Sequence, residues 1–172
     1  NSQISPKLLN PMCGRINCSF SSEQVESLAE SVTGRPCKLS LNHEYKPQPN
    51  ACPGSKLACV TQSGLYLKHW GLIPSYHSKG TVSGGDFFKI FNARLETLDH
   101  RSTFSQLLQT KRCVIFINGY FEWVDKQPYF VTRKDEGPML LAGLHETWRS
   151  GSGRQNLVES FVIVTESSDK IE

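Results

Sequence analysis

The distribution of apolar positions predicts one helix near the N-terminus. Four apolar residues repeat with the spacing of a single helix face over 21–32: Val25, Leu28, Ala29 and Val32. Ser21 and Gln24 form a capping box at the start of this segment. Gly34 and Pro36 follow it, and both residue types stop a helix.

The rest of the chain has the alternation and the β-branched and aromatic content of strands. We expect strands at 56–61, 65–70, 112–117, 120–124, 128–133, 139–143 and 160–165, and one short helix at 102–109. The segment between Pro36 and Gly54 is rich in proline and reads as a long loop. These elements predict an α+β fold with a mostly antiparallel, barrel-like β core and a few flanking helices.

Length and composition exclude several classes of protein. The 172 residues suit one domain, and an apolar content of 38% is sufficient for a real core. No apolar run is long enough for a membrane helix, and residues 1–11 lack the apolar centre of a secretory signal. We therefore expect an intracellular protein, in the cytoplasm of a bacterium or the nucleus of a eukaryote.

The six cysteines do not form a metal-binding pattern. No pair has the C-x-x-C spacing of a structural zinc site, so no metal or cofactor is expected. Without a secretory signal, they are read as reduced thiols, most of them buried. The net charge of +3 does not itself show nucleic-acid binding, but it is compatible with a local basic groove.

Cys13 has two interpretations. It follows Met12, and removal of the residues before it would leave a free α-amine beside its thiol. Such an aminothiol condenses with an aldehyde, first as a Schiff base and then as a five-membered thiazolidine ring. The alternative is one more inert buried thiol.

Three further clusters carry possible chemistry. Asn92 can donate and accept hydrogen bonds, and Arg94 can bind a phosphate, although both residues also suit an ordinary loop. Glu122 would be an acid/base if its strand face is partly buried, or a solvated surface group if it is not. Trp70 could stack on a nucleobase or close the core of a hairpin.

Taken in order, these clusters resemble a known family. The motifs M-C-G-R, W-G-L-I-P, F-N-A-R-L-E-T and N-G-Y-F-E-W, at these separations, are similar to those of the SOS-response-associated peptidase (SRAP) family of abasic-site processing proteins. The resemblance runs from about Met12 to Thr165 and includes the loop at 49–54.

The resemblance implies a function and a set of site residues. Family members bind single-stranded DNA and cross-link an abasic site through a thiazolidine at the exposed N-terminal cysteine, here Cys13. Asn92 would hold the amine or the sugar oxygen, and Glu122 would act as acid/base. The matching DNA-binding positions are Arg15, Asn50, Pro53, Trp70 and Arg94. A monomer is expected, with abasic single-stranded DNA and replication-fork proteins as partners.

The resemblance also bears on the two ends of the chain. Residues 1–11 are expected to be an N-terminal extension, as a propeptide or a remnant of expression, and 12–172 the SRAP domain. Some family members are thought to remove residues ahead of the cysteine autocatalytically. An H-x-R-M-P-type motif of the family would follow the strand at 160–165, so we expect a domain truncated at its C-terminus.

Three alternatives remain open. A noncovalent reader of damaged DNA would use the arginines without the Cys13 amine. A cysteine peptidase acting in trans would need a positioned histidine base, and the papain-like C-G-S-C-W pattern is absent. A degenerate structural paralogue would keep the fold alone.

Overall fold

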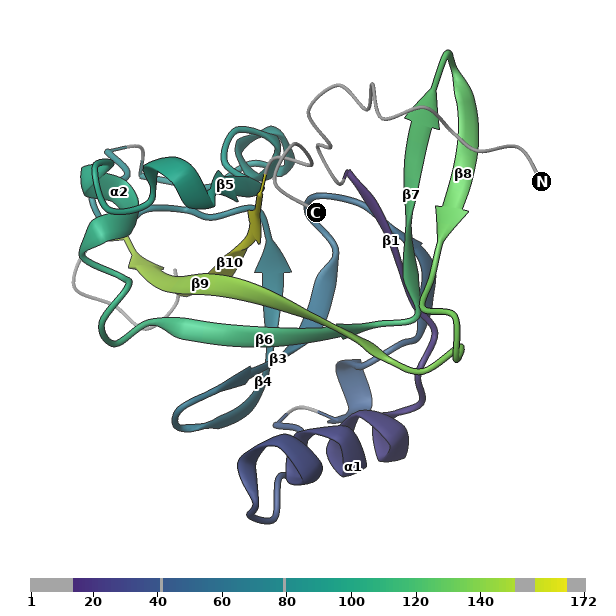
Figure 1. Cartoon of the computed structure of the whole chain (residues 1–172). Helices are drawn as coiled ribbons and strands as arrows, with labels where there is room; N and C mark the ends of the chain where they lie inside the picture. Colours follow the sequence, from purple (N-terminus) through teal and green to yellow (C-terminus); the bar gives the residue numbers. More distant parts are fainter. Residues whose placement is uncertain (1–13, 41, 79, 151–156, 167–172) are drawn as a thin grey trace.

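The computed structural model describes residues 14–40, 42–78, 80–150 and 157–166 (Figure 1). The helices and strands follow in the order β1 (Arg15–Cys18), α1 (Ser22–Thr33), β2 (Gln48–Ala51), β3 (Lys56–Thr61), β4 (Gly64–Trp70), β5 (Asn92–Arg94), α2 (Ser102–Ser105), β6 (Arg112–Ile117), β7 (Gly119–Val124), β8 (Gln127–Val131), β9 (Met139–Arg149) and β10 (Leu157–Thr165). Short 3₁₀ segments lie at Asn42–Glu44, Gly84–Phe88 and Leu95–Thr97.

Five strands close into a barrel. Their order is β4-β3-β6-β9-β10, and β10 returns to pair with β4. The closing pairs are parallel, Ser160 with His69 and Phe161 with Trp70, whereas the other ladders of the barrel are antiparallel. Farther along the same edge of β10, β5 adds a second parallel ladder. The predicted α+β fold with a mostly antiparallel, barrel-like core is confirmed.

A second sheet stands beside the barrel. Its order is β2-β1-β7-β8, and all of its ladders are antiparallel. Figure 1 shows β7 and β8 as a hairpin that projects from the barrel, with β1 next to β7. The inner face of this sheet contributes Ile16, Cys18 and Ala51 to the core cluster inside the barrel.

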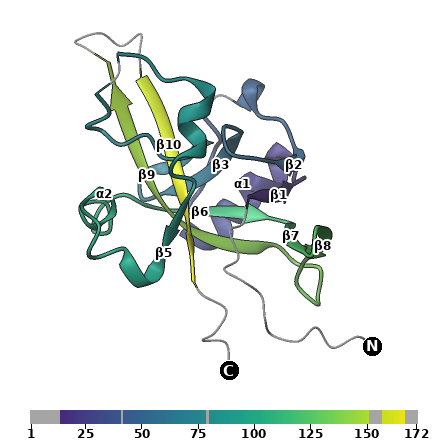
Figure 2. The same cartoon turned by 90° about the horizontal axis from the view of Figure 1, so that it is seen from above.

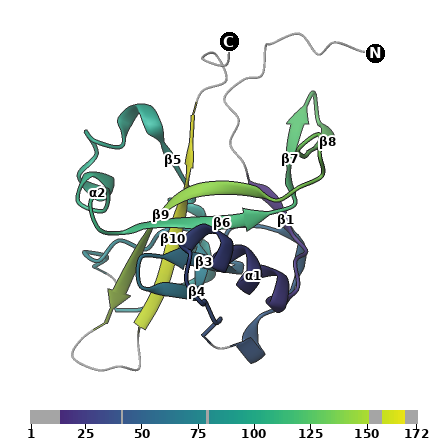
Figure 3. The same cartoon turned by 60° about the horizontal axis from the view of Figure 1, so that its bottom comes forward.

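Helix α1 is set by its caps and by its apolar face. The Ser21 hydroxyl accepts a hydrogen bond from the Gln24 backbone N–H, and Gly34 ends the helix with a left-handed φ of 68°. Val25 and Ala29 pack against apolar side chains of β3, β4 and β6. Figure 3 shows the helix lying alongside these strands, so α1 covers one outer face of the barrel.

The two sides of β10 separate the barrel interior from its outer cover. Phe161 and Ile163 belong to the inner cluster, whereas Val162 packs outward with Leu144 and Phe104. Figure 2 shows β5, β9, β10 and the α2 region on this side of the molecule. The alternation of strand side chains therefore tells which residues near the end of β10 face inward.

The sequence missed three short strands. β1, β2 and β5 have four, four and three residues, and β2 contains Pro49, a residue that weakens any strand prediction. The helix expected at 102–109 is only Ser102–Ser105. In contrast, β9 is longer than the predicted 139–143, because it pairs first with β6 and then with β10. The proposed extension 1–11 lies outside the described residues.

No helix among the described residues combines the length and the apolar character needed to cross a bilayer.

Candidate functional site

The inward face of β10 and β5 ends in polar groups. Ile163 pairs with Asn92, and Thr165 pairs with Arg94 two residues farther on. Paired residues share one face of a sheet, and Ile163 belongs to the inner core cluster. Asn92, Arg94 and Thr165 therefore continue the barrel interior as a polar rim, while Ala93 packs outward with Leu144 and Val162.

On this rim, Arg94 Nη1 and Thr165 Oγ1 are buried without a hydrogen-bond partner in the described part of the chain. Buried polar atoms in proteins are almost always paired, because an unpaired one loses its hydration without compensation. A guanidinium nitrogen beside a hydroxyl has the donors that an anionic oxygen, such as that of a phosphate, accepts.

Glu122 lies on the inner face of β7. Tyr120, on the same face two residues earlier, packs against the core cluster that contains Ile163. Figure 1 shows the end of β10, β5, the start of β1 and the rising strand β7 on one side of the barrel. Glu122 and the polar rim of β10 and β5 thus extend from the same core cluster.

The environment of Glu122 favours its protonated form. Its Oε2 atom is buried and has no hydrogen-bond partner within the described residues. Burial raises the pKa of Glu122, and a hydrogen bond from the Trp123 backbone N–H partly opposes this rise. Desolvation shifts a carboxyl group in the direction that a proton donor needs, and the buried Oε2 atom shows that the partly buried alternative for this strand is the one observed.

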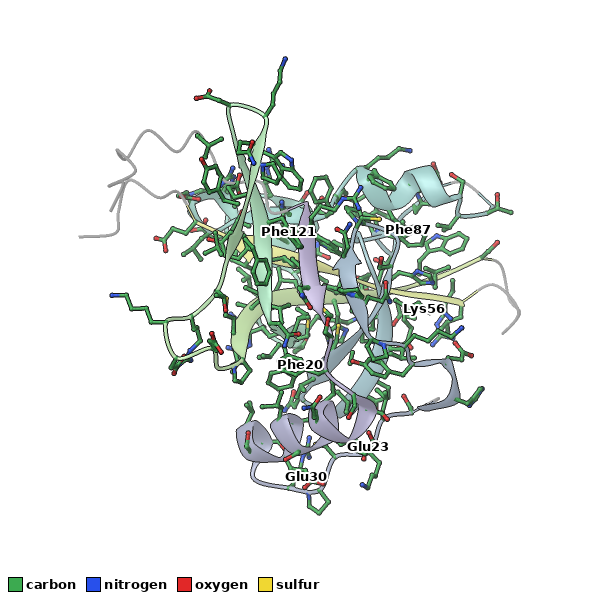
Figure 4. All side chains as sticks on the ribbon, turned by 90° about the vertical axis from the view of Figure 1, so that its right-hand side faces the viewer. Phe20, Glu23, Glu30, Lys56, Phe87 and Phe121 are labelled. Carbon is green, nitrogen blue, oxygen red and sulfur yellow. The ribbon has the colours of Figure 1, made fainter. Side chains whose placement is uncertain are left out.

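Arg15 and Asn50 come together through strand pairing. β1 lies between β2 and β7, and Arg15 Nη1 donates a hydrogen bond to Asn50 Oδ1 at 3.4 Å. Both side chains are exposed. Arg15 pairs with Phe121, so it lies on the outer face of the sheet, opposite to Glu122. Figure 4 looks onto this side of the molecule and shows Phe121 on β7 beside β1.

Trp70 does not line a DNA path in this structure, and that expectation is wrong. Its side chain has an exposed fraction of 0% inside the barrel. The indole N–H donates a 2.9 Å hydrogen bond to the Phe91 carbonyl, and the two rings meet edge to face. Trp70 therefore fixes the backbone immediately before Asn92, and no face of its ring is open to a nucleobase.

Pro53 is also a buried residue, so it contributes little surface to a groove.

The buried state expected for most cysteines holds for Cys18, Cys37, Cys59 and Cys113, and Cys52 is half-buried. In the ranges that the structure describes, no group of three or more His, Cys, Asp or Glu side chains could hold a metal ion.

Cys13, the expected nucleophile, lies outside the described residues, which begin at Gly14. Thr165 is a candidate site residue that the sequence did not single out. A threonine at the end of a strand is ordinary in composition, so only its pairing with Arg94 and its buried hydroxyl mark it.

Comparison with known proteins finds relatives that share most of this chain. The abasic site processing protein YedK of Escherichia coli is 30% identical over 172 residues, which cover 92% of this chain and 69% of the relative. The abasic site processing protein HMCES of Xenopus tropicalis is 25% identical, covering 91% of this chain and 58% of the relative. A similar protein of Bacillus subtilis, YoqW, is 29% identical, and the match spans 59% of its length.

Solved structures share the fold. A crystal structure of a Bacteroides thetaiotaomicron protein superposes with a TM-score of 0.71 at 24% identity, covering 90% of this chain and 68% of that one. The family model described as SOS response associated peptidase (SRAP) matches residues 12–171. The chain therefore belongs to the SRAP family.

Proposed function

We propose that this protein processes abasic sites in single-stranded DNA by forming a covalent cross-link at Cys13, as part of a DNA damage response. The observation that carries the proposal is the register of β1 against β7. Arg15, the first residue of β1, pairs with Phe121, so continuing this antiparallel register by one residue would set Gly14 opposite Glu122. Cys13 is joined to Gly14 by a single peptide unit, in which neighbouring Cα atoms are about 3.8 Å apart.

The chemistry follows from an exposed N-terminal cysteine next to a desolvated carboxyl group. The Cys13 amine attacks the aldehyde carbon of the ring-opened sugar and forms a carbinolamine. The Glu122 carboxylic acid donates a proton to the departing hydroxyl, which leaves as water, and a protonated imine (iminium) remains beside the Glu122 carboxylate. The thiol then adds to the iminium carbon and gives its proton to the Glu122 carboxylate, which closes the neutral thiazolidine. One water is lost in total.

The remaining rim residues suit the DNA strand. An abasic site offers no base to read, so recognition must use the phosphates and the aldehyde itself. Arg94 and Thr165 offer donors for a phosphate oxygen, and Asn92 lies on the same face to hold the sugar oxygen or the amine. Arg15, which is hydrogen-bonded to Asn50, would bind the phosphate of a neighbouring nucleotide at the outer face of the second sheet.

We also propose that Cys13 becomes exposed by autocatalytic hydrolysis of the Met12–Cys13 bond, using the Cys13 thiol and Glu122. Mass spectrometry of the chain beginning at Asn1 tests this step. Release of residues 1–12 that is lost in Glu122→Gln supports it, and equal release in both proteins contradicts it.

A denaturing gel tests the cross-link. Protein beginning at Cys13 should shift single-stranded DNA that carries one abasic site, and Cys13→Ala should abolish the shift. Intact DNA of the same sequence is the matched control. A complex seen on native gels alone would instead favour the noncovalent reader. Replication-fork proteins as partners stay a prediction.

A further inference from the structure

The β7–β8 hairpin holds its aromatic side chains on two different faces. Phe121 pairs with Phe130, and their ring centroids are 5.0 Å apart on the outer face. Glu122 pairs with Tyr129 on the inner face. The side chains of directly opposite residues are close neighbours, with β-carbons about 4.5–5.5 Å apart. Tyr129 is therefore the side chain that β8 presents to Glu122.

The turn of the hairpin fixes this pairing. Val124 pairs with Gln127, which leaves Asp125 and Lys126 as a two-residue loop, with φ values of 50° and 67°. Positive φ at both positions is typical of the type I′ turn, whose twist matches that of the flanking strands. A slip of one residue would move Tyr129 to the outer face and bring Phe130 opposite Glu122. The turn thus determines which aromatic ring covers the carboxyl group.

The other residues that the strand register sets next to Glu122 offer it less cover than the ring of Tyr129. On the β1 side, the register leads to Gly14, which has no side chain, and Arg15 lies on the outer face. On β7 itself, the flanking residues of the same face are Tyr120 and Val124, and Tyr120 packs toward the core cluster. No charged side chain among the described residues contributes to the raised pKa of Glu122, which comes from burial.

The exposure of Tyr129 fits a cover at the edge of a site. Its exposed fraction is 43%, so more than half of its surface is in contact with other atoms, while one side remains open. A tyrosine ring brings a large apolar area to the edge of a pocket and keeps its hydroxyl in water.

We propose that Tyr129 is a positioning residue of this site, whose ring covers the Glu122 carboxyl group and excludes water from it. Its effect on the cross-linking reaction rests on the function proposed above, whereas its effect on Glu122 does not. Removing the ring would rehydrate the carboxyl group and favour its ionised form at neutral pH.

The test measures the carboxyl group directly, by NMR titration of Glu122 in Tyr129→Thr, Tyr129→Phe and the control Phe130→Thr. Threonine removes the ring and keeps a strand-favouring residue. Phe130 has a similar exposure of 48% but lies on the outer face. We expect the pKa of Glu122 to fall by about half a unit to one unit in Tyr129→Thr and to stay unchanged in the other two variants.

Three outcomes would overturn the proposal: no change in Tyr129→Thr, the same fall in Tyr129→Phe, or the same fall in Phe130→Thr. The second would assign the effect to the hydroxyl, and the third to a loosened hairpin. The pH profile of cross-linking in Tyr129→Thr should shift to lower pH together with the titration. The two readouts separate the two proposals. If neither the native protein nor the variants cross-link DNA, but the pKa of Glu122 shifts as expected, the proposed function fails and the positioning role of Tyr129 stands.

Discussion

Thr165 pairs with Arg94 across the parallel β10–β5 ladder, and each residue carries a buried polar atom without a partner among the described residues. The pairing joins the last residue of β10 to β5, a strand of only three residues. Buried polar atoms without partners cost stability, and an anionic oxygen bound between these two residues would satisfy both atoms. This arrangement makes Arg94 the sharpest probe of DNA binding.

Arg94→Ala should weaken binding to single-stranded DNA about tenfold, because the loss of a charge-assisted phosphate contact costs on the order of 1.5 kcal/mol. The slope of log K against log salt should fall by about 0.7, the value for one phosphate of a single strand. Arg112→Ala removes the same charge from an exposed position on β6 and serves as the control. Fluorescence anisotropy at several salt concentrations measures both. An unchanged slope in Arg94→Ala would remove this residue from the phosphate path.

Glu122→Gln should slow cross-linking by at least about tenfold, since general acid–base catalysis contributes roughly 10²–10⁴ in rate. Affinity for single-stranded DNA should change less than about twofold, because glutamine keeps the shape of the side chain. Binding isotherms and single-turnover gels separate the two quantities. Equal losses of rate and affinity would contradict the acid/base role.

The same substitution has an expected effect on stability with a definite sign. Burial raises the pKa of Glu122 in the folded state, so the folded protein binds more protons than the unfolded chain between the two pKa values. Stability therefore decreases as pH rises through this window, and Glu122→Gln removes the decrease. Thermal unfolding should show the variant at least as stable as the native protein at pH 7, with the difference vanishing in acid. A variant less stable at pH 7 would contradict the desolvated carboxyl group.

Trp70→Phe tests the corrected role of that side chain. The change removes the indole hydrogen bond to the Phe91 carbonyl and leaves space in the barrel, so it should lower the free energy of unfolding by about 1–3 kcal/mol. Chemical denaturation gives this value. If Trp70→Phe retained full stability and lost affinity for DNA, the ring would belong to a DNA path after all.

The sequence predicted the long helix and the long strands well, but it missed the short strands and misjudged the burial of one site residue. Helix α1 and strands such as β3 and β6 are long enough for periodicity to define them. Strands β1, β2 and β5 are too short for any pattern, yet they position Arg15, Asn50 and Asn92. Trp70 was misplaced because a tryptophan beside a Gly and a Pro looks alike at a surface and inside a barrel. Only the closure of β4 against β10 decides between the two.

Substitution of Gly143 tests how tightly β9 packs against β10 and β6 below the polar rim. A β-carbon at this position would lie 2.8 Å from the Val162 carbonyl oxygen and 2.9 Å from both Cys113 Sγ and Ile115 Cδ1. Gly143→Ala should therefore lower the free energy of unfolding by about 1–3 kcal/mol through overpacking. Gly80→Ala is the matched control, since a β-carbon there meets nothing within 4 Å. Similar denaturation midpoints for the two variants would show that the barrel can expand at this point.

Capture of the aldehyde by the Cys13 aminothiol is tested most directly by mass spectrometry of the polypeptide beginning at Cys13 after reaction with abasic single-stranded DNA. We expect one adduct, located on the peptide that begins with Cys13, with the summed mass of both reactants less one water. We also expect that blocking the Cys13 amine by acetylation prevents the adduct. An unmodified Cys13 peptide, or an adduct that survives acetylation of the amine, would contradict capture by the aminothiol.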